Sequence, residues 1–565
     1  MATKRDTRTT RWERRALTTA LGLSMVAAAV SVCGPAAADP APHAALSSSL
    51  WGDLSDDLAA LDGHGHNSAS ADPGSLYTIE NAIGARSVWR QQDASGQQIT
   101  GQGVTVALLD SGTAQVAGLD APGKLSYGPD LSVESNGVLT DQDTYGHGTH
   151  LAGIIAGRDS AVLNSRTIDK LDPSVQLGVA PDAKLLSMKL ANTDGSTDVS
   201  QVIAALNWIT EHQTARDGSQ VRVVNLSFGT DSVQPYQLDP LAAAAENAWR
   251  HGLVVVVSGG NGGTDAGRLS DPAIDPYVIA VGAADSDGTV SGWSSPDVAS
   301  FSSGGSDSRH VDLLAPGTSI VSLRDPASYV DTNHPEGRIV GDTTGRLFRG
   351  SGTSQAAAVV SGAVALLLQA YPGLTPDQVK AALTQSASSV SDSPRYAGAG
   401  ELNVSSALNV AKQLATPPCR GLLCHLVNGL FGVNTNVSQS FPVSTGQGSI
   451  EAARAGDDLV DAQGVALTGE VDAQGNAWNP KAWWASASSL SSWNGGSWLG
   501  TIWTGNDWAP SNGLAAARWS AARWSAARWS AARWSDADWS AARWSAARWS
   551  AARWSAARWS DAGWD

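Results

Sequence analysis

The stretch Val104-Thr-Val-Ala-Leu-Leu109, followed directly by Asp110-Ser111-Gly112, decides the fold class of this chain. A continuous run of apolar and β-branched residues, without polar alternation, is typical of a strand buried on both faces of a parallel sheet. A carboxylate directly after such a strand lies at the carboxyl edge of the sheet, where α/β proteins carry their functional sites. Asp110 alone is weak evidence for a site, because many α/β proteins have an aspartate at such a point.

Similar apolar runs recur along the chain and alternate with stretches of helical patterning. The runs that we interpret as buried strands are residues 221–226, 253–257 and 277–281. The stretches that we interpret as helices are residues 198–215, 240–251 and 354–370. This alternation predicts an α/β domain with a parallel sheet over residues 76–415, which ends before Pro417-Pro418.

A histidine with a glycine on each side forms a second candidate motif, Gly146-His147-Gly148-Thr149-His150. The two glycines let the backbone come close to a substrate and leave the imidazole free to face a cleft. An apolar helical run, residues 151–156, follows directly. His147 and His150 could instead be a pair of metal ligands, but the sequence shows no third ligand, and we expect no metal here.

A third motif, Gly350-Ser-Gly-Thr-Ser354-Gln-Ala-Ala357, opens the long apolar helix predicted over residues 354–370. A serine at a helix N-terminus is by default an N-cap. The glycines before Ser354 favour instead a hydroxyl that faces a cleft. The positive end of the helix dipole and the backbone N–H of Ser354 would then stabilise negative charge that develops on an attacked carbonyl oxygen.

A fourth motif, Ser258-Gly259-Gly260-Asn261-Gly262-Gly263, follows the predicted strand that ends at Val257. An asparagine amide between glycines, directly after a buried strand, suits the second donor of an oxyanion hole. Taken alone, the motif is equally a glycine-rich turn with a left-handed asparagine.

In the chain order Asp110, His147, Ser354, these motifs resemble those of the subtilisin family of serine peptidases, family S8. The resemblance extends over roughly residues 77–410. It implies a three-layer α/β domain with a mostly parallel, seven-stranded sheet. It also implies a serine endopeptidase in which Asp110 orients His147, and His147 takes the proton of Ser354. Ser354 would attack the scissile carbonyl carbon to form an acyl-enzyme, while Asn261 and the Ser354 N–H hold the oxyanion.

Two further segments are similar to the substrate-binding walls of the family. Ser227-Phe228-Gly229 resembles the segment that pairs with the bound peptide, and Ser258-Gly259-Gly260 resembles the opposite wall of the primary specificity pocket. The chain also departs from the family: Ala358 and Val359 stand where a proline and a histidine are usual, and Gln355 stands where methionine is frequent. The resemblance implies no cofactor for the chemistry. Structural calcium is common in the family, so the resemblance leaves it possible here, but its ligands are not assignable from this sequence.

The bulk composition narrows the function further. The chain has 565 residues with a net charge of −16, and 42% of them are hydrophobic. One large catalytic domain with appendages is expected at this length, and the charge excludes nucleic acid as the main partner. Three cysteines are too few for a disulfide scaffold. Cys419 and Cys424 either close a small disulfide loop or are two unpaired thiols in a linker.

Residues 1–38 have the features of an export signal. A front rich in lysine and arginine precedes an apolar stretch from Ala16 to about Val32, and Ala36-Ala37-Ala38 suits a signal peptidase. An uncleaved membrane anchor is the alternative, although the apolar run is short for a bilayer span. Residues 39–75 are a polar leader or spacer, shorter than the usual propeptide of the family. We expect a secreted or envelope-associated protein.

The C-terminal part of the chain is rich in tryptophan. Residues 416–475, with mixed patterning, are interpreted as a linker or a small unassigned region, and residues 476–565 as a Trp-rich tail with a five-residue repeat from Trp519 to Trp564. This period fits neither a helix nor a strand, but it suits a pentapeptide β-solenoid. Arginines beside the tryptophans favour contact with the cell envelope or its polysaccharide. A disordered low-complexity extension is the alternative.

Two other functions use parts of the same evidence. A binding protein would keep residues 77–410 as an inactive scaffold, but every predicted catalytic position carries the required residue type. An acyl hydrolase would use the same triad on esters, but a peptide-pairing segment favours extended polypeptides. We therefore expect a serine endopeptidase whose partners are polypeptide substrates.

Overall fold

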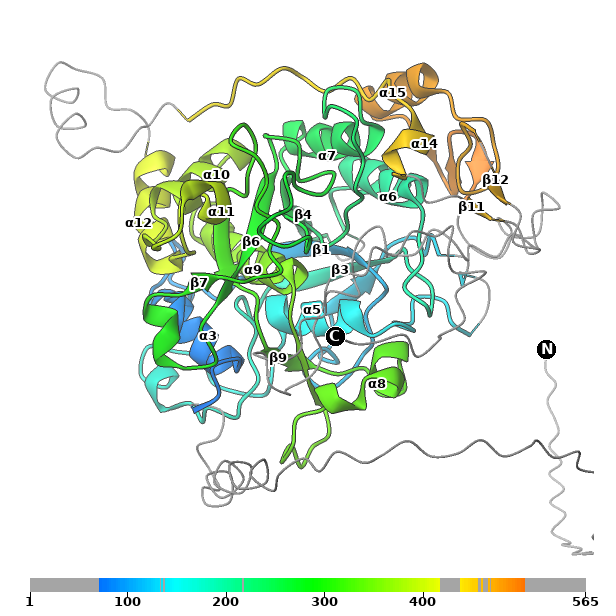
Figure 1. The fold of residues 1–565 in the computed structure, drawn as a ribbon. Helices are drawn as coiled ribbons and strands as arrows, with labels where there is room; N and C mark the ends of the chain where they lie inside the picture. Colours follow the sequence, from blue (N-terminus) through cyan, green and yellow to red (C-terminus); the bar gives the residue numbers. More distant parts are fainter. Residues whose placement is uncertain are drawn as a thin grey trace, which may run out of the picture. The chain divides into compact units, whose positions relative to one another are not determined.

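The structure is a computed structural model, and it describes residues 71–503 with several gaps (Figure 1). The gaps are residues 133, 136–137, 216–217, 417–436, 456–458, 461–465 and 468. The predicted export signal, the leader up to residue 70, both linker cysteines and the tail from residue 504 onward lie outside the described residues.

A mostly parallel β-sheet forms the centre of the described part of the chain. Within these residues seven strands are parallel, in the order β2-β3-β1-β4-β5-β6-β8, and the two-residue β7 pairs antiparallel with β6. The bounds are β1 (Val104–Asp110), β2 (Leu125–Tyr127), β3 (Lys184–Lys189), β4 (Gln220–Leu226), β5 (Val254–Ser258), β6 (Ile279–Asp285), β7 (Asp297–Val298) and β8 (Leu313–Pro316). The predicted α/β fold with a mostly parallel sheet is confirmed.

The composition of the strands explains their burial. Every residue of β1 is buried, and β5 is likewise buried throughout. Side chains on both faces of such a strand need apolar cover, which helices on the two sides of the sheet supply. β1 lies between β3 and β4, so the residue that ends it, Asp110, is placed in the middle of the sheet edge.

Two pairs of long helices cover the sheet. α5 (His147–Ala156) and α9 (Thr353–Ala370) pack against each other and against β1, whereas α6 (Val199–Glu211) packs on α7 (Pro240–Arg250) and both contact the sheet. Asp198 starts α6 with a capping box that includes Gln201. Asp239 caps α7, with a proline at its first position. The helices predicted over residues 198–215, 240–251 and 354–370 are confirmed to within a few residues.

Shorter elements surround this centre. The helices are α3 (Leu76–Ala82), α4 (Ala85–Trp89), α8 (Tyr329–Asn333), α10 (Pro376–Gln385), α11 (Pro394–Ala397) and α12 (Val404–Ala415). β9 (Ile320–Leu323) and β10 (Leu347–Gly350) form an antiparallel pair. Among the described residues, α9 alone has the length and apolar composition of a membrane span, and it is the buried core helix of this domain.

Residues 437–503, which we call the extension, fold onto α6 and α7. After an extended arm they contain α14 (Ile450–Ala453), a pair formed by β11 (Leu459–Val460) and β12 (Ala466–Leu467), and α15 (Pro480–Ser488). They end in a small antiparallel sheet of β13 (Trp493–Asn494), β14 (Ser497–Trp498) and β15 (Thr501–Ile502). α14 contacts α6 and α7, α15 contacts α7, and β13 contacts α6.

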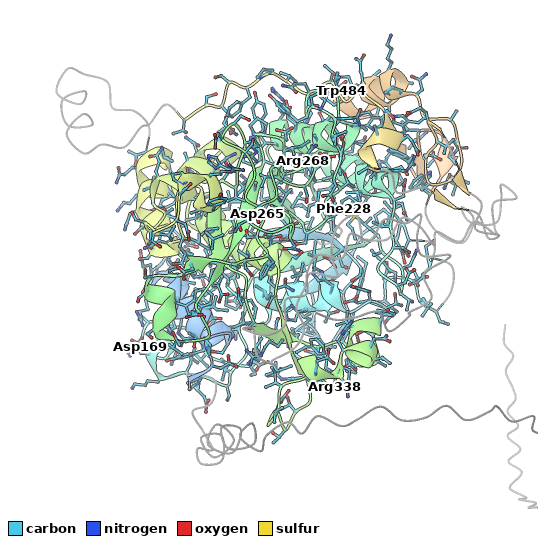
Figure 2. The ribbon with its side chains drawn as sticks, in the orientation of Figure 1. Asp169, Phe228, Asp265, Arg268, Arg338 and Trp484 are labelled. Atoms are coloured by element: carbon cyan, nitrogen blue, oxygen red, sulfur yellow. The ribbon has the colours of Figure 1, made fainter. Side chains whose placement is uncertain are left out.

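The first tryptophans of the Trp-rich region are core residues in this structure. The buried members of the group are Trp478, Trp483, Trp493, Trp498 and Trp503. Trp483 and Trp498 both donate an indole N–H to Oδ1 of Asn207 in α6, at 3.0 and 3.2 Å. Trp484, labelled in Figure 2, lies on α15 and is partly buried. The extension therefore belongs to the same hydrophobic core as the sheet, which the sequence patterning did not predict.

Candidate active site

Asp110 ends β1 and is fully buried. Its carboxylate accepts a hydrogen bond from the backbone N–H of Ser111 at 2.8 Å. Gly112 has a φ of 108°, which turns the chain sharply away from the sheet. The carboxylate is thus held at the carboxyl edge of the sheet, as the sequence predicted for this stretch.

His147 is the first residue of α5 and contacts Asp110. Its Nδ1 lies 3.2 Å from each carboxylate oxygen of Asp110. The close approach depends on Gly148, because a Cβ there would lie 2.0 Å from the carbonyl oxygen of Gly112 and 2.9 Å from Oδ1 of Asp110. The glycine after the histidine therefore serves the packing of α5 against the end of β1.

The protonation of His147 follows from its surroundings. Burial lowers the pKa of His147 well below its ordinary value, and the negative charge of Asp143 opposes this shift. Burial also raises the pKa of Asp110, against the hydrogen bonds that Ser111 donates to it. In its ionised form this carboxylate can only accept hydrogen bonds, and Nδ1 then carries the proton that points at Asp110. The other ring nitrogen, Nε2, is then the basic atom of a neutral imidazole, which suits it to accept a proton.

Asp143 is a second buried carboxylate that organises this corner, and sequence reasoning missed it. It accepts hydrogen bonds of 2.7 Å each from the Ser111 hydroxyl, the Gly146 N–H and the Thr149 N–H. It thereby ties the loop after β1 to the first turn of α5, which carries His147. The sequence did contain a signal for Asp143, because an aspartate just before a helix often accepts hydrogen bonds from the free N–H groups at the helix start.

Ser354 is the second residue of α9 and is 7% exposed. Thr353 donates both its backbone N–H and its hydroxyl to Oδ1 of Asn261, each at 2.9 Å. The amide oxygen of Asn261 is therefore engaged, and its Nδ2 lies on the other side, 3.6 Å from where a Cβ of Gly352 would be. The structure thus brings Asn261 beside the turn that presents Ser354. Sequence reasoning did not single out Thr353.

The predicted peptide-pairing segment also reaches Ser354. Ser227 directly follows β4, and its hydroxyl donates to the carbonyl oxygen of Ser354 at 3.3 Å. Phe228, labelled in Figure 2, is buried. The segment therefore runs beside the start of α9, where a peptide held along it would pass the serine.

The two predicted pocket walls converge on Ser270. A Cβ at Gly229 would lie 2.7 Å from the Cβ of Ser270, and one at Gly260 would lie 2.4 Å from its hydroxyl. The Ser270 N–H donates to the carbonyl oxygen of Gly259 at 3.1 Å, and Ser258 closes β5 just before this contact. Ser270, which the sequence analysis did not mention, therefore lies between the walls.

The departures from the family pattern lie inside a regular helix. Gln355, Ala358 and Val359 are fully buried, and α9 runs without interruption from Thr353 to Ala370. An alanine in place of proline leaves the N–H of residue 358 available to the helix. The helix that carries Ser354 is therefore regular where the chain departs from the family pattern.

The second histidine of the motif has a structural environment. Nε2 of His150 faces the carbonyl oxygens of Ile320 at 3.3 Å and Phe348 at 3.2 Å, which connects α5 to β9 and β10. Across the part of the chain that the structure describes, no three His, Cys, Asp or Glu side chains form a cluster that could hold a metal ion. Nε2 of His150 thus contacts backbone carbonyl oxygens rather than other candidate metal ligands.

These residues lie at the carboxyl ends of neighbouring parallel strands: Asp110 ends β1, Ser227 directly follows β4, and Asn261 lies in the loop after β5. A buried Asp–His pair, a serine at a helix start and an amide donor beside it can support nucleophilic attack on a carbonyl carbon. The fold and the site together define the class of the serine hydrolases.

Comparison with known proteins identifies the family within this class. The model of the subtilase family, Peptidase_S8, matches residues 101–405, more than half of the chain, and the chain belongs to this family. The match covers all strands of the central sheet and the three motifs around Asp110, His147 and Ser354.

Curated relatives agree with this assignment. The chain is 34% identical over 334 residues to serine protease AprX of Bacillus subtilis, covering 58% of this chain and 70% of the relative. It is 31% identical over 314 residues to subtilisin DY of Bacillus licheniformis, covering 55% and 93%. It is 32% identical over 314 residues to subtilisin Savinase of Lederbergia lenta, covering 56% and 94%. The protein is a serine-type endopeptidase, and its substrates are polypeptides.

Proposed function

We propose that this peptidase is exported and cleaves its substrates through the triad Asp110, His147 and Ser354. The observation that carries the proposal is the contact of His147 Nδ1 with both carboxylate oxygens of Asp110, on a helix, α5, that packs against the helix of Ser354. The export signal predicted over residues 1–38 supports action outside the cytoplasm.

The chemistry follows from these positions. Nε2 of His147 takes the hydroxyl proton of Ser354 while the oxygen attacks the scissile carbonyl carbon, and the resulting imidazolium is stabilised by Asp110. The proton then passes to the leaving amine, the C–N bond breaks, and an acyl-enzyme remains. Water attacks the acyl-enzyme with His147 again as base, which releases the second product and restores the serine. These reaction steps need no cofactor.

Two donors would stabilise the oxyanion. The backbone N–H of Ser354 lies in the first turn of α9, where helix N–H groups have no intrahelical acceptor. Nδ2 of Asn261 is the second donor, aligned by the bonds from Thr353 to the amide oxygen. Ser227–Gly229 would pair with the substrate backbone, and Ser258–Gly260 would form the other wall of the primary specificity pocket.

Substitution at Ser354 tests the proposal. Ser354→Ala is expected to lower kcat on a peptide substrate by at least about 10⁴-fold, and Asn261→Ala by about 10²–10³-fold, with the fold intact. The matched control is Ser361→Ala on the same helix, where the hydroxyl bonds to Asn225 and activity should persist. Undiminished activity of Ser354→Ala on casein would contradict the triad.

We also propose that the Trp- and Arg-rich repeats hold the enzyme on the cell envelope or its polysaccharide. The sequence from Leu514 to Asp565 carries eight arginines and four aspartates, so this part is basic in an acidic protein. Retention on isolated envelopes should fall when the chain ends at Trp503, while peptide hydrolysis stays unchanged. Equal retention of the shortened and full chains would rule the contact out.

A further inference from the structure

An extended arm, residues 437–449, lies against the loop of residues 231–239. The arm can be followed in Figure 1 as the segment that leads into α14. Three hydrogen bonds of 2.7–2.8 Å join it to backbone oxygens of the loop: Ser444 Oγ to Tyr236, Thr445 N to Gln237 and Gly448 N to Leu238. The loop is therefore held along its length by a segment more than 200 positions later in the chain.

Gln234 lies in the loop, and its side chain forms two hydrogen bonds with one residue of the arm. Its Oε1 accepts from the Ser449 N–H at 2.9 Å, and its Nε2 donates to the Ser449 carbonyl oxygen at 2.7 Å. This reciprocal pair reproduces the bonding of one residue in a β-ladder. A Cβ at Gly448 would lie 2.3 Å from Oε1 of Gln234, so the arm has a glycine where it passes this side chain.

Gln234 also contacts a buried carboxylate behind the loop. Its Nε2 lies 3.1 Å from Oδ2 of Asp239, which also accepts from the hydroxyl of Ser232 at 2.8 Å. The other oxygen of Asp239 caps α7 through the Leu241 N–H at 2.8 Å. Asp239 is fully buried and thus connects both ends of the loop to the arm through Gln234.

The start of the loop is tied to the pocket walls. Thr230 exchanges two backbone hydrogen bonds with Asp271, at 2.9 and 2.8 Å. Asp271 directly follows Ser270, the residue on which the walls at Gly229 and Gly260 converge. A displacement of the loop would therefore move the Gly229 wall together with Ser270, which lies between the two walls.

We propose that residues 437–449 brace the primary specificity pocket and that Gln234 is the positioning residue that transmits this support to the wall at Gly229. The inference rests on the proposed function, which makes Ser227–Gly229 and Ser258–Gly260 the pocket walls. A peptide side chain that enters the pocket pushes these walls apart. The brace resists this movement, so it affects binding and the choice of the residue before the scissile bond. We expect the arm to have no effect on the reactivity of Ser354 itself.

The test compares Gln234→Ala with Gln439→Ala in the full-length enzyme. Gln439 lies in the same arm but bonds to Asp377 and the Tyr277 carbonyl oxygen, away from the loop. On a series of peptides that differ in the residue before the scissile bond, Gln234→Ala should raise KM by about five- to tenfold, the scale of one or two lost hydrogen bonds, and change kcat less than about twofold. The ranking of the peptides should change as well, whereas Gln439→Ala should alter neither KM nor ranking.

A second measurement separates this inference from the proposed triad. A small dialkyl fluorophosphate should label Ser354 at equal rates in the parent enzyme and both variants, since it does not fill the pocket. Unchanged KM and ranking in Gln234→Ala, with normal labelling, would overturn the brace but leave the triad intact. Failure to label the parent enzyme would overturn the triad. Equal changes of KM and ranking in both glutamine variants would show that the arm only stabilises the fold in general. That result would also overturn the proposed support of the pocket. If Gln234→Ala does not fold, the isosteric Gln234→Glu replaces it, because a carboxylate cannot donate to Ser449 or Asp239.

Discussion

Glu401 shows how a single buried side chain makes the stability of this enzyme depend on pH. It lies between two chain segments, with backbone bridges to Leu314 of β8 and to Ser388, and is 6% exposed. Burial raises the pKa of Glu401 to about 8. The folded protein therefore keeps this carboxyl group protonated at pH values where the unfolded chain ionises it.

The sign of the pH effect follows from this difference. The unfolded carboxyl group loses its proton near pH 4.3, whereas the folded one keeps it up to about pH 8. Glu401 therefore contributes stability below pH 4.3 that is lost progressively as pH rises to about 8. Glu401→Gln should raise the Tm by several degrees at pH 8 and leave it nearly unchanged at pH 4. Thermal melts at both pH values test this, with exposed Glu336→Gln as the control. Equal effects at the two pH values would contradict the assignment.

At the scale of elements, a buried ion pair joins the extension to α6. Arg454, directly after α14, donates through Nε to Oδ2 of Asp198 at 2.7 Å, and Asp198 is the N-cap of α6. Both side chains are almost completely buried. Burial by itself would raise the pKa of Asp198, but the charge of Arg454 holds this pKa below its ordinary value. The extension thus supplies the counter-ion that, together with hydrogen bonds from Ser200, favours the ionised carboxylate.

Removing the arginine is expected to destabilise the protein strongly. Arg454→Met leaves a buried carboxylate without its charged partner, which costs about 3–5 kcal/mol of unfolding free energy. The double variant with Asp198→Asn should recover a large part of this loss, because no buried charge then remains. Denaturant unfolding of the two single variants and the double variant measures the coupling. Additive losses would show that the two residues do not act as a pair.

The elements also show which parts of the fold the sequence could predict. The strands and long helices were predictable because their apolar periodicity is a local property, as in β1 and α9. The four motifs were predictable because each combines glycine with a polar residue at a strand end or helix start. The two-residue β7 and the ladder between β9 and β10 carry no comparable pattern, since short strands depend on distant partners.

For the whole molecule, the packing of residues 437–503 was the feature that sequence reasoning could not supply. A five-residue spacing of tryptophans matches no regular period, and it gave no indication that Trp483 and Trp498 meet the same amide. Their acceptor, Asn207, precedes them by 276 and 291 positions, and no local pattern reports contacts over that distance. Gln234 was missed for the same reason, because its role depends on tertiary neighbours, whereas Asp143 had a local signal in its position just before a predicted helix.

The late position of the extension also affects when the enzyme becomes complete during its synthesis. α6 is made early, but the arginine that neutralises its cap follows 256 positions later. Contacts over such separations form slowly, because a long loop must close, at a cost in chain entropy, before the contacts can form. A ribosome must therefore translate through residue 503 before the outer surface of α6 is covered. The protease therefore reaches its final packing only after residues 437–503 have been synthesised and have closed against α6 and α7.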